Sequence, residues 1–67
     1  MDRELIIRNL HGQIEGLASL HIRHGLQHSE GFQRRRERIR QIISENGIDV
    51  RRELDPIIVL LYRRYFE

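Results

Sequence analysis

Apolar residues recur along the first third of the chain at helical spacing. At about 100° per residue they fall into one stripe, formed by Ile6, Ile7, Leu10, Ile14 and Leu17. Charged residues and small residues occupy the remaining positions. This pattern predicts a helix over about residues 2–24 that packs one face against a core.

Two further stripes follow along the chain. The second predicts a helix over residues 29–46 and consists of Phe32, Ile39, Ile42 and Ile43. The third covers residues 49–66 and consists of Val50, Leu54, Ile57, Ile58, Leu61 and Tyr65. It crosses Pro56, which suits the first position of a helix, and the residue before a proline avoids helical backbone angles. We therefore expect a break near residues 55–56, with a helix capped by Asp55, in preference to one kinked helix.

Two helix-stop signals of the same form separate these segments. Gly25 and Gly47 are each followed by an apolar residue, Leu26 and Ile48. Glycine takes a positive φ without steric cost, and the next side chain can then fold back on the last helical turn. A serine or aspartate, which are common N-caps, follows each glycine. The sequence thus predicts one all-α domain over residues 1–67, a three-helix mini-domain made of a helical hairpin and a C-terminal helix.

The second half of the third predicted helix carries more apolar residues than one face can hold. A helix that is apolar on every side is a buried one, and a chain of 67 residues has little material to cover it. We therefore expect a homodimer or larger oligomer. Its contact would use apolar residues outside the stripe with an arginine rim, namely Val59, Leu60, Tyr62, Phe66, Arg63 and Arg64. The function predicted from this surplus is that of a small regulatory or adaptor protein, which acts through helix-mediated protein–protein interaction and self-association.

An arginine-rich run in the second predicted helix suggests an alternative, a nucleic-acid-binding regulator. All twelve basic residues of the chain are arginine, but the net charge is only +2. On a helix, Arg34 and Arg38 lie on one side, whereas Arg36 and Arg40 lie on the other flank. Arg35 points into the apolar sector, where it would extend to solvent or pair with a carboxylate of another helix. Binding would thus need a dimer that joins two basic surfaces, so nucleic acid is the less favoured partner.

Histidines supply the remaining candidate chemistry. His21 and His24 are three residues apart at the end of the first predicted helix, where histidine also suits the negative end of the helix dipole. We expect packing and capping roles rather than a metal site, because no further ligand follows at a zinc-binding spacing. His21 is the one expected to be buried, as a contact that could respond to pH. Without cysteines or a catalytic motif, the sequence indicates no enzyme and no cofactor.

A face of small residues lies opposite the main stripe of the first predicted helix. It consists of Gly12, Gly16 and Ser19, and it is either a close-packing surface or a tolerated exposed one. If it is a contact, we expect it to meet something other than the core of this chain. The longest apolar run, residues 57–62, is far shorter than the ~20 residues that cross a bilayer. The N-terminus also lacks a signal-peptide pattern, so we expect a soluble cytoplasmic protein.

Overall fold

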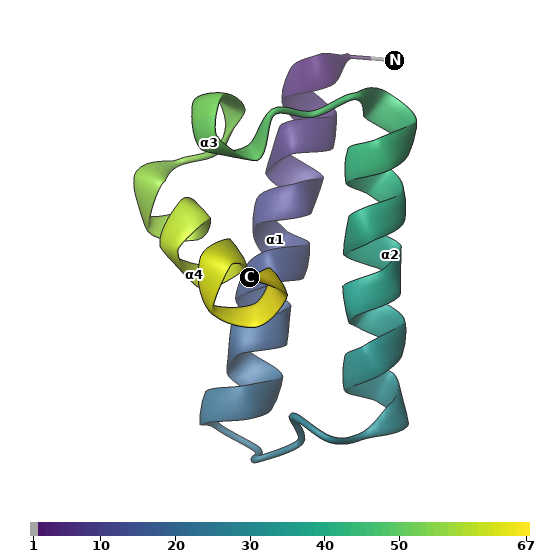
Figure 1. Cartoon of the computed structure of the whole chain (residues 1–67), viewed down its shortest axis with the longest axis vertical. Coiled ribbons are helices and arrows are strands. Elements are labelled where there is room, and N and C mark those ends of the chain that lie inside the picture. Colours follow the sequence, from purple (N-terminus) through teal and green to yellow (C-terminus); the bar gives the residue numbers. More distant parts are fainter. Residues whose placement is uncertain (1) are drawn as a thin grey trace.

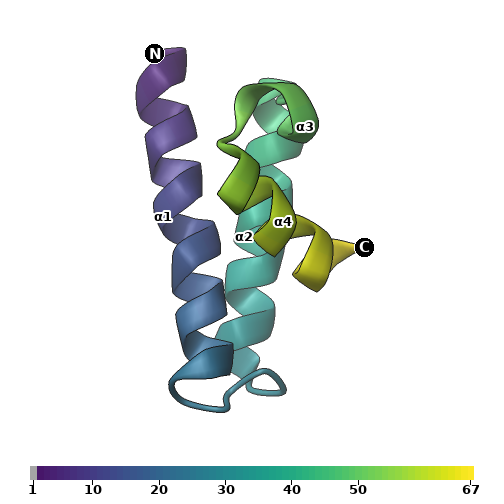
Figure 2. The same cartoon turned by 90° about the vertical axis from the view of Figure 1, so that its left-hand side faces the viewer.

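The described part of the chain, residues 2–67 of a computed structural model, is helical and contains no strand. Its elements are α1 (Arg3–Ile22), α2 (Glu30–Asn46), α3 (Val50–Glu53) and α4 (Pro56–Phe66). α1 and α2 run antiparallel as a hairpin, and α3 and α4 lie on one side of it (Figures 1 and 2). The molecule measures 32 × 21 × 19 Å. The all-α prediction is confirmed, whereas the oligomeric state stays a prediction.

Each helix begins at a capping side chain. Asp2, Ser29, Asp49 and Asp55 each accept a hydrogen bond from the backbone N–H two or three residues further on, at 3.0–3.3 Å. Such a bond satisfies an N–H group that the helix itself leaves free, and replacing a cap by alanine costs about 1 kcal/mol. The N-terminal boundaries are thus set locally by the sequence.

Gly47 ends α2 in the predicted left-handed conformation, with a φ of 56°. The Ile48 N–H donates to the Ile43 carbonyl at 3.1 Å, and the Gly47 N–H donates to the Ser44 carbonyl at 3.4 Å. This pair of bonds is the Schellman motif. It directs the Ile48 side chain into the core, where it is buried.

Gly25 ends α1 with the same backbone sign but a different outcome. Its φ is 61°, and its N–H donates to the His21 carbonyl at 3.0 Å. α1 ends at Ile22, two residues before its predicted end. The Leu26 side chain remains 44% exposed, so this turn adds little to the core.

The predicted break before Pro56 is present. Leu54 has extended backbone angles (φ −92°, ψ 153°), and Pro56 is the first residue of α4. The first of the two expected arrangements is therefore confirmed, a single helical turn and then a capped helix. The extended Leu54 also points its side chain into the core, where it is buried.

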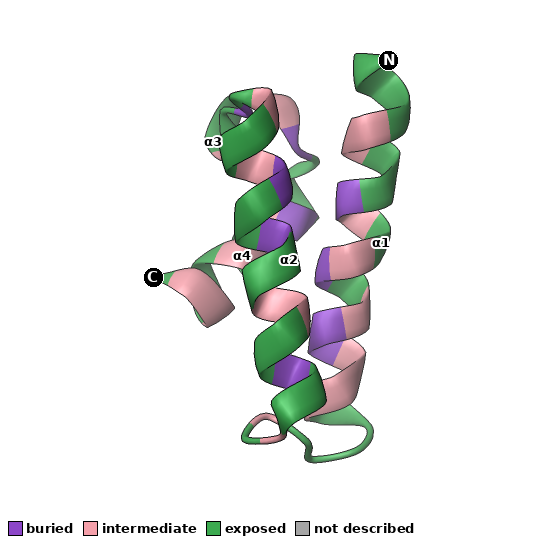
Figure 3. Cartoon of the chain, turned by 90° about the vertical axis from the view of Figure 1, so that its right-hand side faces the viewer, coloured by how far each residue is buried: buried purple, intermediate pink, exposed green. Residues whose placement is uncertain are grey.

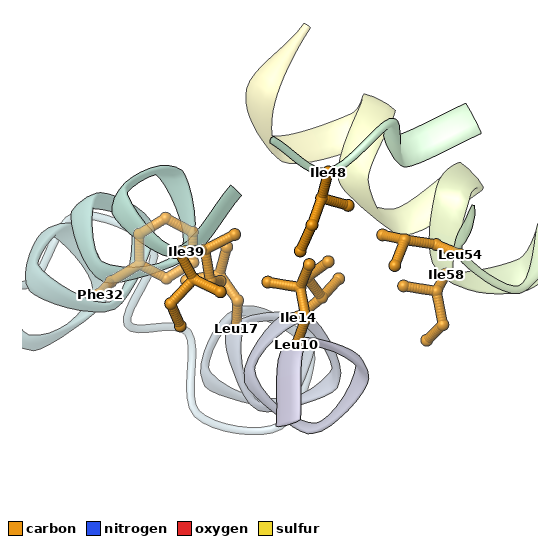
Figure 4. Close-up of a cluster of buried hydrophobic side chains, with 9 residues drawn as sticks. Leu10, Ile14, Leu17, Phe32, Ile39, Ile48, Leu54 and Ile58 are labelled. Atoms are coloured by element: carbon orange, nitrogen blue, oxygen red, sulfur yellow. The ribbon is translucent and has the colours of Figure 1, made fainter. Parts of the chain in front are cut away.

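The core lies between the hairpin and the C-terminal segment (Figure 4). Four side chains at its centre are fully buried, three from α1 and one from α2: Leu10, Ile14, Leu17 and Ile39. The other buried members come from α2, α4 and the segments beside α3: Phe32, Ile42, Ile48, Leu54 and Ile58. No buried polar or charged side chain occurs among residues 2–67. Burial of apolar surface, worth about 25 cal/mol per Å², is thus the main force that joins the helices.

Candidate interaction surface on the C-terminal helix

α4 lies across the open side of the hairpin, and its C-terminal end projects away from it (Figures 2 and 3). Its first turn is anchored to α1, because the Asp55 backbone N–H donates to Nε2 of His11 at 3.3 Å. Ile58 is buried against the core, as predicted. Ile57 was predicted in the same stripe, and this prediction is wrong: its side chain is 69% exposed.

The buried side of α4 is rotated from the predicted one. Val59, Tyr62 and Phe66, which we expected to point outward, are half-buried and pack against the core. The physical reason is that α4 contacts both helices of the hairpin, so that both of its flanks are covered. These three predicted interface residues therefore contribute first to the fold of the single chain.

Arginines of α2 cover the aromatic end of α4. The Tyr62 and Phe66 rings stack with centroids 4.6 Å apart and planes 9° from parallel. The guanidinium carbons of Arg36 and Arg40 each lie 5.5 Å from the centroid of the Phe66 ring. A cation over an aromatic face is worth about 0.5–1 kcal/mol at exposed sites. This contact holds α4 against α2 and engages two of the arginines proposed for nucleic-acid binding.

A second aromatic contact holds α4 against α1. The Tyr65 hydroxyl lies 2.8 Å from Nδ1 of His21, and the two rings meet edge to face with centroids 5.5 Å apart. Phe32 of α2 meets the same tyrosine at 5.9 Å. His21 is half-buried, whereas His24 is exposed. His21 therefore has a packing role, and its response to pH stays a prediction.

The remaining side of α4 is open, and we call it the outer face: Ile57, Leu60 and Arg64. Leu60 follows Ile57 by three residues and precedes Arg64 by four, so the three side chains are neighbours on the helix surface. Ile57 is 69% exposed and Leu60 is 63% exposed. Arg63 and Arg64 are exposed as well, as the rim prediction requires. Of the predicted interface, Leu60 and the two arginines are accessible, and Ile57 is the residue that the sequence analysis missed.

Ion pairs join the ends of the C-terminal segment to the rest of the chain. Arg51 donates to Glu67 at 2.9 Å. Arg3 binds Glu53 through two hydrogen bonds and also donates to the backbone carbonyls of Asn46 and Gly47 at 3.1 and 3.2 Å. The Arg3 bonds, together with a bond from the Asp49 backbone N–H, lower the pKa of Glu53 to about 2. Arg3 therefore fastens the start of α1 to the end of α2 and to α3.

The arginine run does not form one basic strip. Arg34 pairs with Glu30 at 3.5 Å, and Arg40 pairs with Glu37 at 2.8 Å. Carboxylates thus alternate with arginines along this surface, which weakens its attraction for a phosphate backbone. Since Arg36 and Arg40 lie over Phe66, the nucleic-acid alternative depends mainly on Arg34 and Arg38.

Arg35 and the small-residue face meet within the chain. Arg35 donates to the amide oxygen of Gln13 at 3.1 Å, so its expected carboxylate partner is an amide instead. A Cβ added at Gly16 would lie 2.7 Å from Nη1 of Arg35, whereas one at Gly12 would meet nothing within 4 Å. Gly16 therefore makes room for a side chain of α2. The expectation that this face would meet something outside the chain is wrong at that position.

Other kinds of site find no support in residues 2–67. They contain no group of three or more histidine, cysteine, aspartate or glutamate side chains that could hold a metal ion. None of their helices is both long and apolar enough to cross a membrane. Comparisons with protein-family models, curated proteins and solved structures found no match.

Proposed function

We propose that this protein is a small helical interaction module, regulatory or adaptor in role, that self-associates through the outer face of α4. The observation that supports this proposal most directly is the exposure of Ile57 and Leu60 on adjacent turns of one helix. Apolar side chains exposed together on a small domain are typical of interaction surfaces. Arg63 and Arg64 beside them supply the polar rim that such surfaces have.

The position of this pair separates it from the other exposed apolar side chains. Leu5 lies in the first turns of α1, whereas Ile22 and Leu26 lie at the far end of the hairpin. In the described chain, only α4 places two large exposed apolar residues within three or four positions of each other. Burial of both by a partner would recover the hydrophobic free energy that the fold of one chain leaves unused.

The size of the face sets the strength that we expect. A standard stable interface buries about 800 Å² on each partner. Two aliphatic side chains and an arginine rim supply only part of that area, and association also carries an entropic cost. The proposed self-association is therefore weak, with a dissociation constant that we expect to be micromolar or weaker.

Sedimentation equilibrium over a wide range of protein concentration tests the proposal. The wild type should rise from the monomer mass of 8.1 kDa toward the mass of a dimer as concentration increases. Leu60→Glu should abolish the rise, because it places a charge in the centre of the contact. The matched control is Leu5→Glu, the same change at a residue of α1 that is 56% exposed. A wild type that stays monomeric at millimolar concentration, or equal effects of both variants, would refute the proposal.

A further inference from the structure

Opposite charges stand at the two ends of the outer face of α4. Asp55 precedes the helix, and its carboxylate accepts a hydrogen bond from the Ile57 N–H at 3.0 Å. Arg64 lies in the last turn. Both residues are exposed, and neither makes an ion pair within residues 2–67. The neighbouring Arg63 differs, because it lies 3.9 Å from Glu67. The face therefore has one uncompensated negative end, an apolar centre and one uncompensated positive end.

Such a face is complementary to itself in only one orientation. We propose that two copies of the chain dock with their α4 helices antiparallel, with Leu60 near the two-fold axis and Arg64 beside Asp55 of the partner subunit. Leu60 lies near the midpoint between the two charges in the sequence, so one register brings both pairs together at once. This inference rests on the proposed function, and it adds the identity of the partner and its orientation.

The parallel orientation lacks these advantages. It would place Asp55 beside Asp55 and Arg64 beside Arg64, and like charges at an interface are unfavourable. It would also align the two helix dipoles, whereas antiparallel helices bring the positive end of one near the negative end of the other. Charge complementarity therefore sets the direction, and Ile57 and Leu60 supply the apolar contact.

Single cysteines in this cysteine-free chain can measure the orientation. A disulfide needs Cα atoms within about 7 Å of each other. At 1.5 Å per residue, two antiparallel copies separate their Ile57 positions by about 9 Å and their Arg64 positions by about 12 Å along the axis. Leu60→Cys should therefore cross-link to itself, whereas Ile57→Cys and Arg64→Cys should not. A mixture of the last two variants should form the mixed disulfide.

Ser44→Cys, at an exposed residue of α2, gives the rate of cross-linking by random collision. We expect Leu60→Cys and the mixed pair to exceed this rate by about tenfold or more, the factor that corresponds to 1.4 kcal/mol of preferred contact. Self-cross-linking of Ile57→Cys at the rate of Leu60→Cys would overturn the antiparallel register. So would cross-linking of every variant at the Ser44→Cys rate while the wild type still dimerises. A monomeric wild type would instead refute the proposed function itself.

Neutral variants test the charges separately. Asp55→Asn keeps a good N-cap, and Arg64→Gln keeps most of the side chain, but each removes one charge. For two symmetry-related exposed pairs, we expect each variant to weaken the dimer by about two- to tenfold at low salt. The double variant should be no weaker than either single one, because both remove the same interaction. Additive losses would overturn the pairing of Arg64 with Asp55 of the partner subunit.

Discussion

The α1–α2 hairpin and α4 are both rich in apolar residues, but they use them differently. In α1 the apolar residues form one stripe, and Leu10, Ile14 and Leu17 are fully buried. In α4 the apolar residues surround the helix, so that one side closes the core while Ile57 and Leu60 remain exposed. The comparison teaches that the fold of a single chain accounts for the apolar residues of the hairpin but not for all of those in α4.

The two regions are also held by different forces. The centre of the hairpin contains only aliphatic side chains. α4 is held in addition by polar and aromatic contacts at its flanks, from Tyr65 to His21 and from Phe66 to Arg36 and Arg40. Such contacts are each worth about 1 kcal/mol or less, so the docking of α4 should be the more easily weakened part of the fold.

Alanine substitutions should separate the two regions most strongly. Ile14→Ala should lower the free energy of unfolding by about 2–5 kcal/mol, because it leaves a cavity at a fully buried site. Leu60→Ala should change it by less than about 0.5 kcal/mol, because the side chain is mostly in solvent. Urea unfolding followed by circular dichroism, at concentrations where the protein is monomeric, measures both. Similar losses at the two sites would contradict the comparison.

Glycine substitutions should sharpen it at the connection between the regions. Gly47→Ala should cost about 1–2 kcal/mol, since a residue with a Cβ is strained at a φ of 56°. Gly12→Ala should instead stabilise the protein by up to about 1 kcal/mol, because alanine favours the helix and the new Cβ meets nothing within 4 Å. Thermal unfolding of both variants gives the sign directly. Stabilisation by Gly47→Ala would contradict the assigned cap.

Removal of one hydroxyl tests how α4 is held. Tyr65→Phe should cost about 0.5–1.5 kcal/mol, because it removes the 2.8 Å contact with His21 and keeps the ring packing. The matched control is Tyr62→Phe, whose hydroxyl makes no hydrogen bond within the described chain, and we expect a smaller loss there. Equal values in urea unfolding would show that the His21 contact contributes nothing.

Acid should weaken the attachment of α3 before it affects the core. Glu53 has a pKa of about 2 in the folded protein and an ordinary value of 4.5. Its contribution is therefore fully present above about pH 4.5 and is lost as the pH falls toward 2. Glu53→Gln should lower the melting temperature at neutral pH and have progressively less effect between pH 4.5 and 2. Glu15→Gln, at an exposed site on α1, is the control, and an identical pH profile for both variants would contradict this role.

The hairpin could be predicted from the sequence because its signals are local. The stripe of α1, the serine cap of α2 and the glycine stops all act within a few residues, and the structure confirms them. The Pro56 break is local in the same sense. The limit shows at Leu26 and Ile48, which follow identical signals. One is exposed and the other buried, because tertiary packing decides what lies beyond the turn.

The orientation of α4 could not be predicted from its own sequence. With apolar residues on every side, periodicity gives no unique inner face, and Ile57 and Val59 exchange their expected positions. The inner face is selected by α1 and α2, through contacts such as those of His21 and Arg40 that are remote in sequence. The surplus was therefore correctly located in α4, but only Leu60 and the two arginines of the predicted contact prove accessible.

The most direct test of the central claim is a dilution series followed by methyl NMR. The methyl signals of Ile57 and Leu60 should shift with protein concentration, because their surroundings change when two copies meet. Those of Leu5 and Ile22, which are exposed on α1, should stay constant. Constant positions for Ile57 and Leu60 from micromolar to millimolar protein, or equal shifts at all four residues, would contradict a specific contact on the outer face of α4.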